Sequence, residues 1–213
     1  MAESMELFRR ILARQLACPS GLVGRWFTAG WLDRANVAMN RSTLEHLHIK
    51  QGDRVLEIGF GGGDLLEQIL SDGQCEFVAG VDRSVDMVRV VEKRLRRIAK
   101  GNFEVRVGDI EDVPYEDGSF TKLCSVNTLY FWRQPSVAMA ECRRVLRDGG
   151  TMVLCFNSKE NLIGWPVHKH GFRLYDLEEV ESMFTDAGFV SVDVVSESDQ
   201  GKVRFYCVSG VAG

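Results

Sequence analysis

Residues 55–64 read Val-Leu-Glu-Ile-Gly-Phe-Gly-Gly-Gly-Asp, and this segment is the strongest indication of the fold class. An apolar, strand-like run contains the acidic residue Glu57, a glycine-rich turn follows, and residues 65–70 then show a helical pattern. A strand, a glycine turn and a helix N-terminus together form a cradle for a small polar ligand. Because glycine has no Cβ, the backbone of such a turn can approach a ligand closely. The sequence therefore predicts an α/β fold with a ligand site after its first strand.

The composition indicates one ordinary globular domain. The chain has 213 residues, of which 45% are hydrophobic and 26% charged, and its net charge of −4 argues against a nucleic-acid-binding protein with a strong basic face. None of the six cysteines forms a C-x-x-C pair, which disfavours a zinc ribbon and favours a reducing, cytoplasmic setting. The sequence shows no apolar run of transmembrane length, so we expect no integral membrane segment.

Short apolar runs alternate with helical patterns, which predicts a parallel sheet with helices on both faces. The predicted strands are residues 54–58, 76–81, 103–107, 122–127, 151–156, 190–195 and 203–209, and helices are predicted at 86–99, 135–146 and 176–187. Only residues 196–202 separate the last two strands, too few for a crossover helix, so these strands should form an antiparallel hairpin. Residues 1–50 have no clear strand pattern and are predicted to form an N-terminal helical cap or lid before a domain at 51–213.

The glycine turn departs from the dinucleotide-binding pattern. That pattern is G-x-G-x-x-G, whereas residues 57–63 read E-x-G-x-G-x-G and position 64 is Asp. The carboxylate of Glu57 would repel a pyrophosphate and would suit a ligand with a positive ammonium group. A tight turn without a ligand is the alternative interpretation.

Two further acids follow predicted strands. Asp82 ends the second strand, where its carboxylate could accept hydrogen bonds from vicinal ribose hydroxyls or, alternatively, cap the next helix. Arg83 and Met87 come next and could flank an adenine ring. After the third strand, Asp109 could accept from an exocyclic amine while the N–H of Ile110 donates to a ring nitrogen, although a plain turn is the alternative.

Residues 127–132, Asn-Thr-Leu-Tyr-Phe-Trp, leave the fourth strand and should lie beside the reactive end of the ligand. Tyr130, Phe131 and Trp132 are candidates for the wall of a substrate pocket. Aromatic packing within the loop explains any one of them equally well.

These motifs, in this order, resemble the class I S-adenosylmethionine-dependent methyltransferases, especially the small-molecule branch that includes the quinone-biosynthesis C-methyltransferases. The resemblance covers residues 50–213, and it includes Asp117-Gly-Ser-Phe120 before the fourth strand and Leu146-Arg-Asp-Gly-Gly150 before the fifth. It implies a Rossmann-like, seven-stranded, mostly parallel sheet with the C-terminal antiparallel hairpin.

The resemblance also implies roles for cofactor residues. The glycine turn would line the methionine moiety and the ribose, the acids would hold the ribose hydroxyls and adenine, and a backbone carbonyl after the fourth strand would accept from the methionine amine. The residues concerned are Glu57, Gly59, Gly61, Gly63, Asp82, Arg83, Met87, Asp109, Ile110 and Asn127.

Two absences narrow the expected substrate. The Pro-Pro-aromatic signature of nucleic-acid amino-methyltransferases does not follow Asn127, and no Asp/His cluster suggests a metal-dependent catechol-type enzyme. We therefore expect methyl transfer from S-adenosylmethionine to a small-molecule acceptor, without a metal, by a monomer or homodimer. A cofactor-binding pseudoenzyme or interaction protein is the first alternative. A nicotinamide-dependent oxidoreductase is the second, and Glu57, Asp64 and the terminal hairpin oppose it.

The acceptor side is the less defined part of the predicted site. His170 and Tyr130 are candidate bases, since a base is needed only if the acceptor must lose a proton. His170 lies in a loop, and a solvated loop histidine is the alternative. The candidate substrate-pocket residues are Trp26, Trp132, Arg173 and Tyr175.

Overall fold

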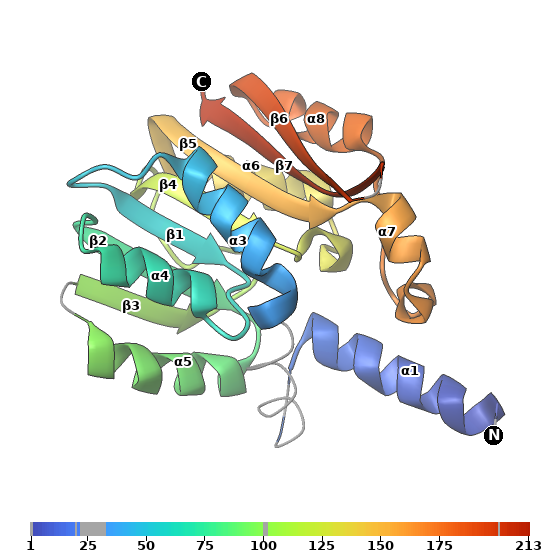
Figure 1. Cartoon of the computed structure of the whole chain (residues 1–213). Coiled ribbons are helices and arrows are strands. Elements are labelled where there is room, and N and C mark those ends of the chain that lie inside the picture. Colours follow the sequence, from blue (N-terminus) through green and yellow to red (C-terminus); the bar gives the residue numbers. More distant parts are fainter. Residues whose placement is uncertain (1, 20, 22–32, 100–101, 200) are drawn as a thin grey trace.

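The computed structural model describes residues 2–19, 21, 33–99, 102–199 and 201–213 (Figure 1). Its centre is a seven-stranded sheet in the order β3-β2-β1-β4-β5-β7-β6. The first five strands of that order are parallel, and β7 is antiparallel to both β5 and β6. The predicted sheet with its terminal antiparallel hairpin is therefore confirmed. The strands are β1 (Arg54–Ile58), β2 (Phe77–Asp82), β3 (Asn102–Val107), β4 (Phe120–Val126), β5 (Leu146–Asn157), β6 (Phe189–Asp199) and β7 (Lys202–Ala212).

Helices cover both faces of the sheet. On one face lie α3 (Asp33–Leu47), α4 (Asp64–Asp72) and α5 (Val85–Ile98), and on the other lie α6 (Pro135–Val145) and α8 (Leu177–Asp186), as Figure 1 shows. The remaining helical segments are α1 (Ala2–Ala17), α7 (Lys159–Ile163) and the short 3-10 turns η2 (Leu129–Phe131) and η3 (Pro166–Lys169).

The N-terminal region divides between these layers. α3 packs on β4, β5 and β7, in the same layer as α4, whereas α1 packs against η3 and lies away from the centre of the sheet (Figure 1). The division of the chain at residue 50 stays a prediction. No helix within the described ranges is long and apolar enough to cross a bilayer.

Alternate residues of the central strands face opposite helical layers, because successive side chains of a strand point to opposite faces. Val55 of β1 belongs to the apolar cluster under α3, α4 and α5, whereas its neighbour Leu56 belongs to the cluster under α6 and α8. Both are fully buried. Burial on both faces explains why these strands read as continuous apolar runs rather than as an alternating pattern.

The predicted boundaries are wrong at two places. The helix predicted at 135–146 and the strand predicted at 151–156 have a wrong boundary, because α6 ends at Val145 and β5 begins at Leu146, which pairs with Phe120. The pairing shifts register between Phe120 and Lys122, so Gly149 and Gly150 lie in the irregular first part of β5. The hairpin also continues to Asp199 and Lys202, since strand pairing extends across polar residues that periodicity assigns to a loop.

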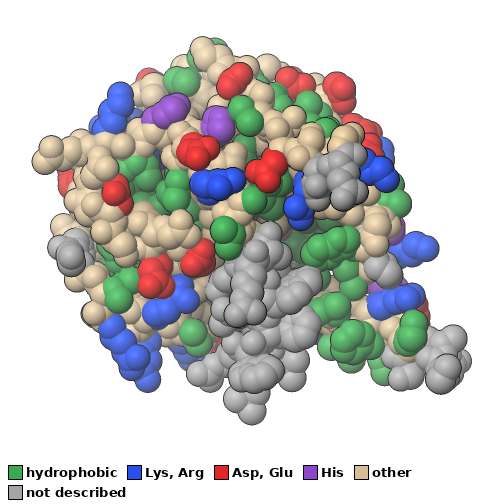
Figure 2. All heavy atoms as spheres, viewed as in Figure 1, with side chains coloured by type: hydrophobic (Ala, Val, Ile, Leu, Met, Phe, Trp, Pro, Cys, Tyr) green, Lys and Arg blue, Asp and Glu red, His purple; other side chains and the backbone are tan. Residues whose placement is uncertain are grey.

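The chain order reverses at β1, which has β2 on one side and β4 on the other. In an open α/β sheet, ligands bind beyond the carboxyl ends of the strands at such a switch point. The glycine turn after β1 and the loops after β2, β3 and β4 all leave the sheet at this edge. The fold therefore brings these four loops to one edge of the sheet. On the face drawn in Figure 2, acidic and basic side chains are intermixed over the described surface.

Candidate active site

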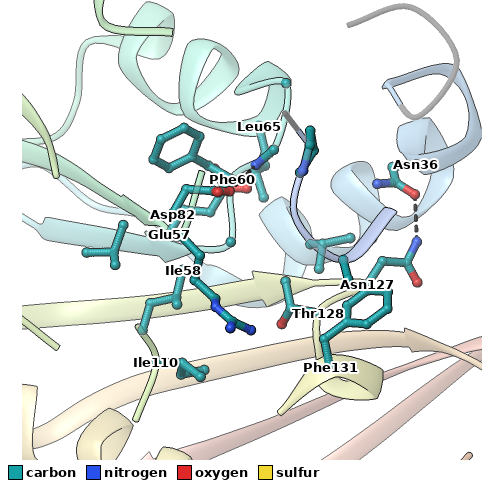
Figure 3. Close-up of a pocket in the computed structure, with 18 of the residues that line it drawn as sticks. Asn36, Glu57, Ile58, Phe60, Leu65, Asp82, Ile110, Asn127, Thr128 and Phe131 are labelled. Carbon is teal, nitrogen blue, oxygen red and sulfur yellow. Dashed lines mark hydrogen bonds between the residues drawn. The ribbon is translucent and has the colours of Figure 1, made fainter. Parts of the chain in front are cut away.

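A cavity lies at this carboxyl edge and contains about 1020 Å³ of space outside protein atoms, part of it open to solvent. The lining comes from the glycine turn, the ends of β2, β3 and β4, the first half of α3 and the end of α1. Figure 3 shows Glu57 and Asp82 on one side of this cavity and Asn127, Thr128 and Phe131 on the other.

The first glycines of the turn are required by local geometry. Gly59 has a φ of 76°, and a Cβ there would lie 2.3 Å from Cγ2 of Thr128. Gly61 has a φ of 48° and donates its backbone N–H to Asp82 Oδ2 at 2.9 Å. Left-handed conformations of this kind favour glycine. Both residues line the cavity, together with Glu57, whose exposed fraction is only 3%.

Gly63 and Met87 are predicted cofactor residues that are not part of the cavity lining. Gly63 precedes α4 with a φ of 78°, and a Cβ there would lie 2.6 Å from Cγ1 of Val91 on α5. Met87 is fully buried in the apolar cluster between α5 and the sheet. The structure thus gives both residues packing contacts, and their contact with a cofactor stays a prediction.

Asp82 has its carboxylate held by two backbone N–H groups, from Gly61 to Oδ2 at 2.9 Å and from Ser84 to Oδ1 at 2.8 Å. Burial raises the pKa of Asp82, and the N–H groups of Ser84 and Gly61 and the charge of Arg83 oppose that rise. The helix cap is supplied by Ser84, whose hydroxyl accepts from the Met87 N–H at 3.2 Å. Asp82 is therefore not the cap of α5, and each of its oxygens keeps capacity for a further hydrogen bond.

Asp109 and Ile110 line the part of the cavity after β3. Asp109 Oδ1 accepts from the Glu111 N–H at 3.1 Å, while Oδ2 lies 3.5 Å from Arg83 Nε and 3.2 Å from an Arg133 guanidinium nitrogen. Arg83 also lines the cavity. The Asp109 carboxylate is thus already charge-paired, and its backbone turn presents Ile110 toward the cavity.

Asn127 lies at the end of β4 in a left-handed conformation, with a φ of 58°. Its side-chain nitrogen donates to Asn36 Oδ1 on α3 at 2.6 Å, the dashed line in Figure 3. The following residue, Thr128, accepts from Trp132 Nε1 at 3.1 Å, which fixes the indole at the cavity wall. Trp132, a predicted pocket residue, is thus part of the lining, and so is Phe131.

Three other acceptor-side candidates are not part of the cavity lining: His170, Arg173 and Tyr175. His170 Nε2 lies 3.3 Å from Glu6 Oε1, so the imidazole joins the η3 region to α1. The Arg173 guanidinium lies over the ring of Tyr175 at 4.9 Å from its centroid, and Tyr175 is 2% exposed. Trp26 lies outside the described residues. The acceptor roles assigned to these residues stay predictions.

Tyr130 is buried, and its hydroxyl donates to Asn127 Oδ1 at 2.9 Å and accepts from the Asn157 N–H. Burial raises the pKa of Tyr130 far above the ordinary value, more than the hydrogen bonds from Asn157 lower it. A phenol with so high a pKa is a poor base near neutral pH. The structure thus places Tyr130 behind Asn127 and outside the cavity lining.

Several lining residues were missed by sequence reasoning. Asn36 and Asn40 enter from α3, and Asn40 Nδ2 donates to Asp64 Oδ2 at 3.1 Å, which joins α3 to the start of α4. Leu16, Ala17 and Pro19 enter from the end of α1. The signal for α3 was its asparagines among apolar residues, but nothing in the sequence indicated which of its faces meets the glycine turn.

Comparison with known proteins agrees with this site. A family model described as a methyltransferase domain matches residues 56–154. The uncharacterized methyltransferase YdaC of Bacillus subtilis is 29% identical over 133 residues, which are 62% of this chain and 72% of YdaC. The protein YrhH of the same organism is 31% identical over 121 residues, which are 54% of this chain and 67% of YrhH.

Among solved structures, the fold is similar to phosphoethanolamine N-methyltransferase 2 of Haemonchus contortus in complex with S-adenosyl-L-methionine. The TM-score is 0.73 over 89% of this chain and 56% of that chain, at 18% identity. This likeness concerns the fold alone. The methyltransferase-domain match and the sequence relatives show that the chain belongs to the class I S-adenosylmethionine-dependent methyltransferases.

Proposed function

We propose that this protein transfers a methyl group from S-adenosylmethionine to a small-molecule acceptor and releases S-adenosylhomocysteine. One observation carries the proposal: two buried acids, Glu57 at 3% and Asp82 at 8% exposure, line the same cavity beside the glycine turn. Buried carboxylates disfavour a pyrophosphate by like-charge repulsion, and they favour a ligand with hydroxyls and positive charge. S-adenosylmethionine has a ribose diol, an ammonium group and a sulfonium.

The residues present fit such a donor. Asp82 has free acceptor capacity for the ribose hydroxyls, because Ser84 supplies the helix cap in its place. The Gly59–Gly61 turn would line the methionine moiety, with Glu57 nearby, and the backbone carbonyl of Asn127 would accept from the methionine amine. Asp109 and Ile110, which line the cavity, would recognise adenine.

Bound S-adenosylmethionine supplies an activated methyl group. The chain's own task is to hold donor and acceptor in line and to exclude water, since orientation alone can supply roughly 7–11 kcal/mol of the barrier in favourable cases. Phe131 and Trp132 form an apolar wall, and Asn36 and Asn127 supply amides near it. A neutral small molecule with an apolar ring or chain fits this wall. The described residues form no cluster suited to a metal ion, and we propose no metal.

Calorimetry with S-adenosylmethionine, S-adenosylhomocysteine and NAD tests the donor. We expect micromolar-range binding of the two adenosyl compounds, and weakening by at least tenfold in Asp82→Ala, because that variant removes the carboxylate that accepts from the ribose. Asp186→Ala, an exposed acid at the end of α8, is the matched control and should bind as the wild type does. Binding of NAD without binding of the sulfonium would contradict the proposal.

Turnover separates an enzyme from a pseudoenzyme with the same cavity. S-adenosylhomocysteine formation should be followed against a panel of phenols, quinols, amines and thiols. We expect turnover with one of these classes, and its loss in Asp82→Ala. Tight donor binding without turnover across the panel would favour the binding-protein alternative.

A further inference from the structure

The side chain of Asn127 is held at every polar atom. Its nitrogen donates to Asn36 Oδ1 at 2.6 Å, and its oxygen accepts from the Tyr130 hydroxyl at 2.9 Å and from Asn157 Nδ2 at 2.7 Å. The nitrogen also lies 3.2 Å from the sulfur of Met39. An amide with all of these contacts has one orientation, because turning it would place donors against donors.

The backbone of Asn127 needs such support. A residue other than glycine in a left-handed conformation costs on the order of 1–2 kcal/mol, although asparagine tolerates it better than most. The Asn127 N–H donates to the Cys155 carbonyl of β5 at 2.9 Å, which fixes one side of the residue. The contacts of the side chain help to fix the direction in which the chain leaves β4.

Tyr130 is the centre of these contacts. Its hydroxyl bridges the side chain of Asn127 and the backbone N–H of Asn157, so it joins the ends of β4 and β5. Its ring stacks on Phe172 at a centroid distance of 5.6 Å and meets the edge of Phe131 at 6.0 Å. The ring is therefore held by packing, and the hydroxyl is held by hydrogen bonds.

The same contacts extend to two helices, α3 and α7. Asn36 belongs to α3, and Asn161 of α7 donates its Nδ2 to Asn157 Oδ1 at 2.6 Å. A chain of four side-chain amides and one phenol thus runs from α3 through the ends of β4 and β5 to α7. The four amides are partly buried and Tyr130 is buried. A satisfied polar network of this kind favours one arrangement of the parts that it joins.

We propose that Tyr130 is a positioning residue, which holds Asn127 in its left-handed conformation and so fixes the protein surface that receives the amino-acid end of the donor. This inference rests on the proposed function. The strand order supports a local effect: β4 lies on one side of β1, and β2 and β3 lie on the other. Asp82 ends β2, and Asp109 lies in the loop after β3. Loss of the Tyr130 hydroxyl should therefore disturb the amino-acid end of the site and leave the nucleoside end intact.

Two ligands distinguish effects at the two ends of the proposed site. S-adenosylhomocysteine has the amino-acid end of the donor, and 5′-methylthioadenosine lacks it. Tyr130→Phe keeps the ring and removes the hydroxyl. By calorimetry we expect about tenfold weaker binding of S-adenosylhomocysteine, the size of a lost hydrogen bond to a positioned group. Binding of 5′-methylthioadenosine should change by less than about twofold. Tyr206→Phe on β7, away from the cavity lining, is the matched control and should change neither value.

Other outcomes overturn the inference. Equal weakening of both ligands would indicate a general loss of structure, and unchanged binding of both would leave Tyr130 without a positioning role. If Tyr130→Phe does not fold, Asn36→Ala removes one bond at the edge of the same network and should show the same selective weakening by about threefold. Failure of the wild type to bind S-adenosylhomocysteine would refute the proposed function instead, so the two failures are distinguishable.

Discussion

Gly59, in the loop after β1, lies directly against Thr128, in the loop after β4. A Cβ at Gly59 would lie 2.3 Å from Thr128 Cγ2 and 3.3 Å from Thr128 Cβ. Thr128 cannot move away freely, because its hydroxyl lies 2.5 Å from the Ser125 hydroxyl and accepts from the Trp132 indole. The glycine turn is thus shaped as much by its neighbour within the protein as by any ligand.

Gly59→Ala should destabilise the protein even without a ligand. We expect a loss of more than about 2 kcal/mol, from left-handed strain together with the contact to Thr128. Urea denaturation measures this loss. The double variant Gly59→Ala/Thr128→Ser should recover part of it, since serine lacks the methyl carbon that a Cβ would meet. A double variant no more stable than the single one would show that this contact is not the cause.

Gly63→Ala tests whether the third glycine of the motif serves packing. A Cβ at Gly63 would meet Val91 at 2.6 Å, whereas Gly73, which follows α4 with a similar φ of 72°, has open space around it. Both alanine variants bear left-handed strain of about 1 kcal/mol. Gly63→Ala should be the less stable of the two in urea denaturation by at least a further 1 kcal/mol or so. Equal losses would argue against the packing role.

Ser84→Ala should remove the N-cap of α5. Caps of this kind contribute about 1 kcal/mol, and Ser84 also donates to the Pro19 carbonyl. We expect a fall in unfolding free energy of about 1–2 kcal/mol, with faster hydrogen exchange confined to the first turn of α5. Ser182→Ala on the exposed side of α8 is the control, and its change should stay within about 0.5 kcal/mol. A change at Ser84 no larger than the control would refute the capping role.

Asp82 should make stability depend on pH. Burial raises its pKa in the folded protein. A carboxyl group of this kind favours folding at low pH, and that contribution is lost as the pH rises through the raised pKa. The Asp82→Asn variant has no titratable side chain at this position. The Tm of the variant minus the Tm of the wild type should therefore increase from about pH 4, near the ordinary Asp pKa, toward neutral pH.

The slope of that difference, rather than its value at one pH, is the test. An amide at position 82 also faces two N–H donors, from Gly61 and Ser84, and this mismatch adds a constant offset. Asp186→Asn removes one negative charge at an exposed position and controls for net charge. A difference that decreases with rising pH would contradict the assignment.

The sequence was sufficient to predict the sheet, because strands buried on both faces leave unmistakable apolar runs, and residues 196–202 are too few for a crossover. It was also sufficient to predict that Glu57, Asp82 and Asp109 lie at one edge of the sheet, since the carboxyl ends of parallel strands share an edge. It failed at Leu146, which the pattern assigns to a helix, because strand pairing with Phe120 prevails over local propensity.

The acceptor side was much less predictable, for a physical reason. Its residues come from α3, η2 and the segment after β5, and their directions depend on tertiary hydrogen bonds rather than on a strand end. Tyr130 and Asn127 are three positions apart in sequence, yet the role of the phenol becomes visible only once Asn36 and Asn157 are placed around them. From sequence alone, a tyrosine in a loop is as readily interpreted as a catalytic base as it is as a positioning residue.

The place of β7 has a consequence for biosynthesis. β7 lies between β5 and β6 in the sheet, although both of these strands precede it in the chain. During translation, β6 therefore leaves the ribosome before β7, the strand with which it pairs. It can join the sheet only after residues 202–212 have left the exit tunnel. The sheet then gains its last two strands in one step. We expect premature release of the nascent chain before that point to expose the edge of β5 to aggregation.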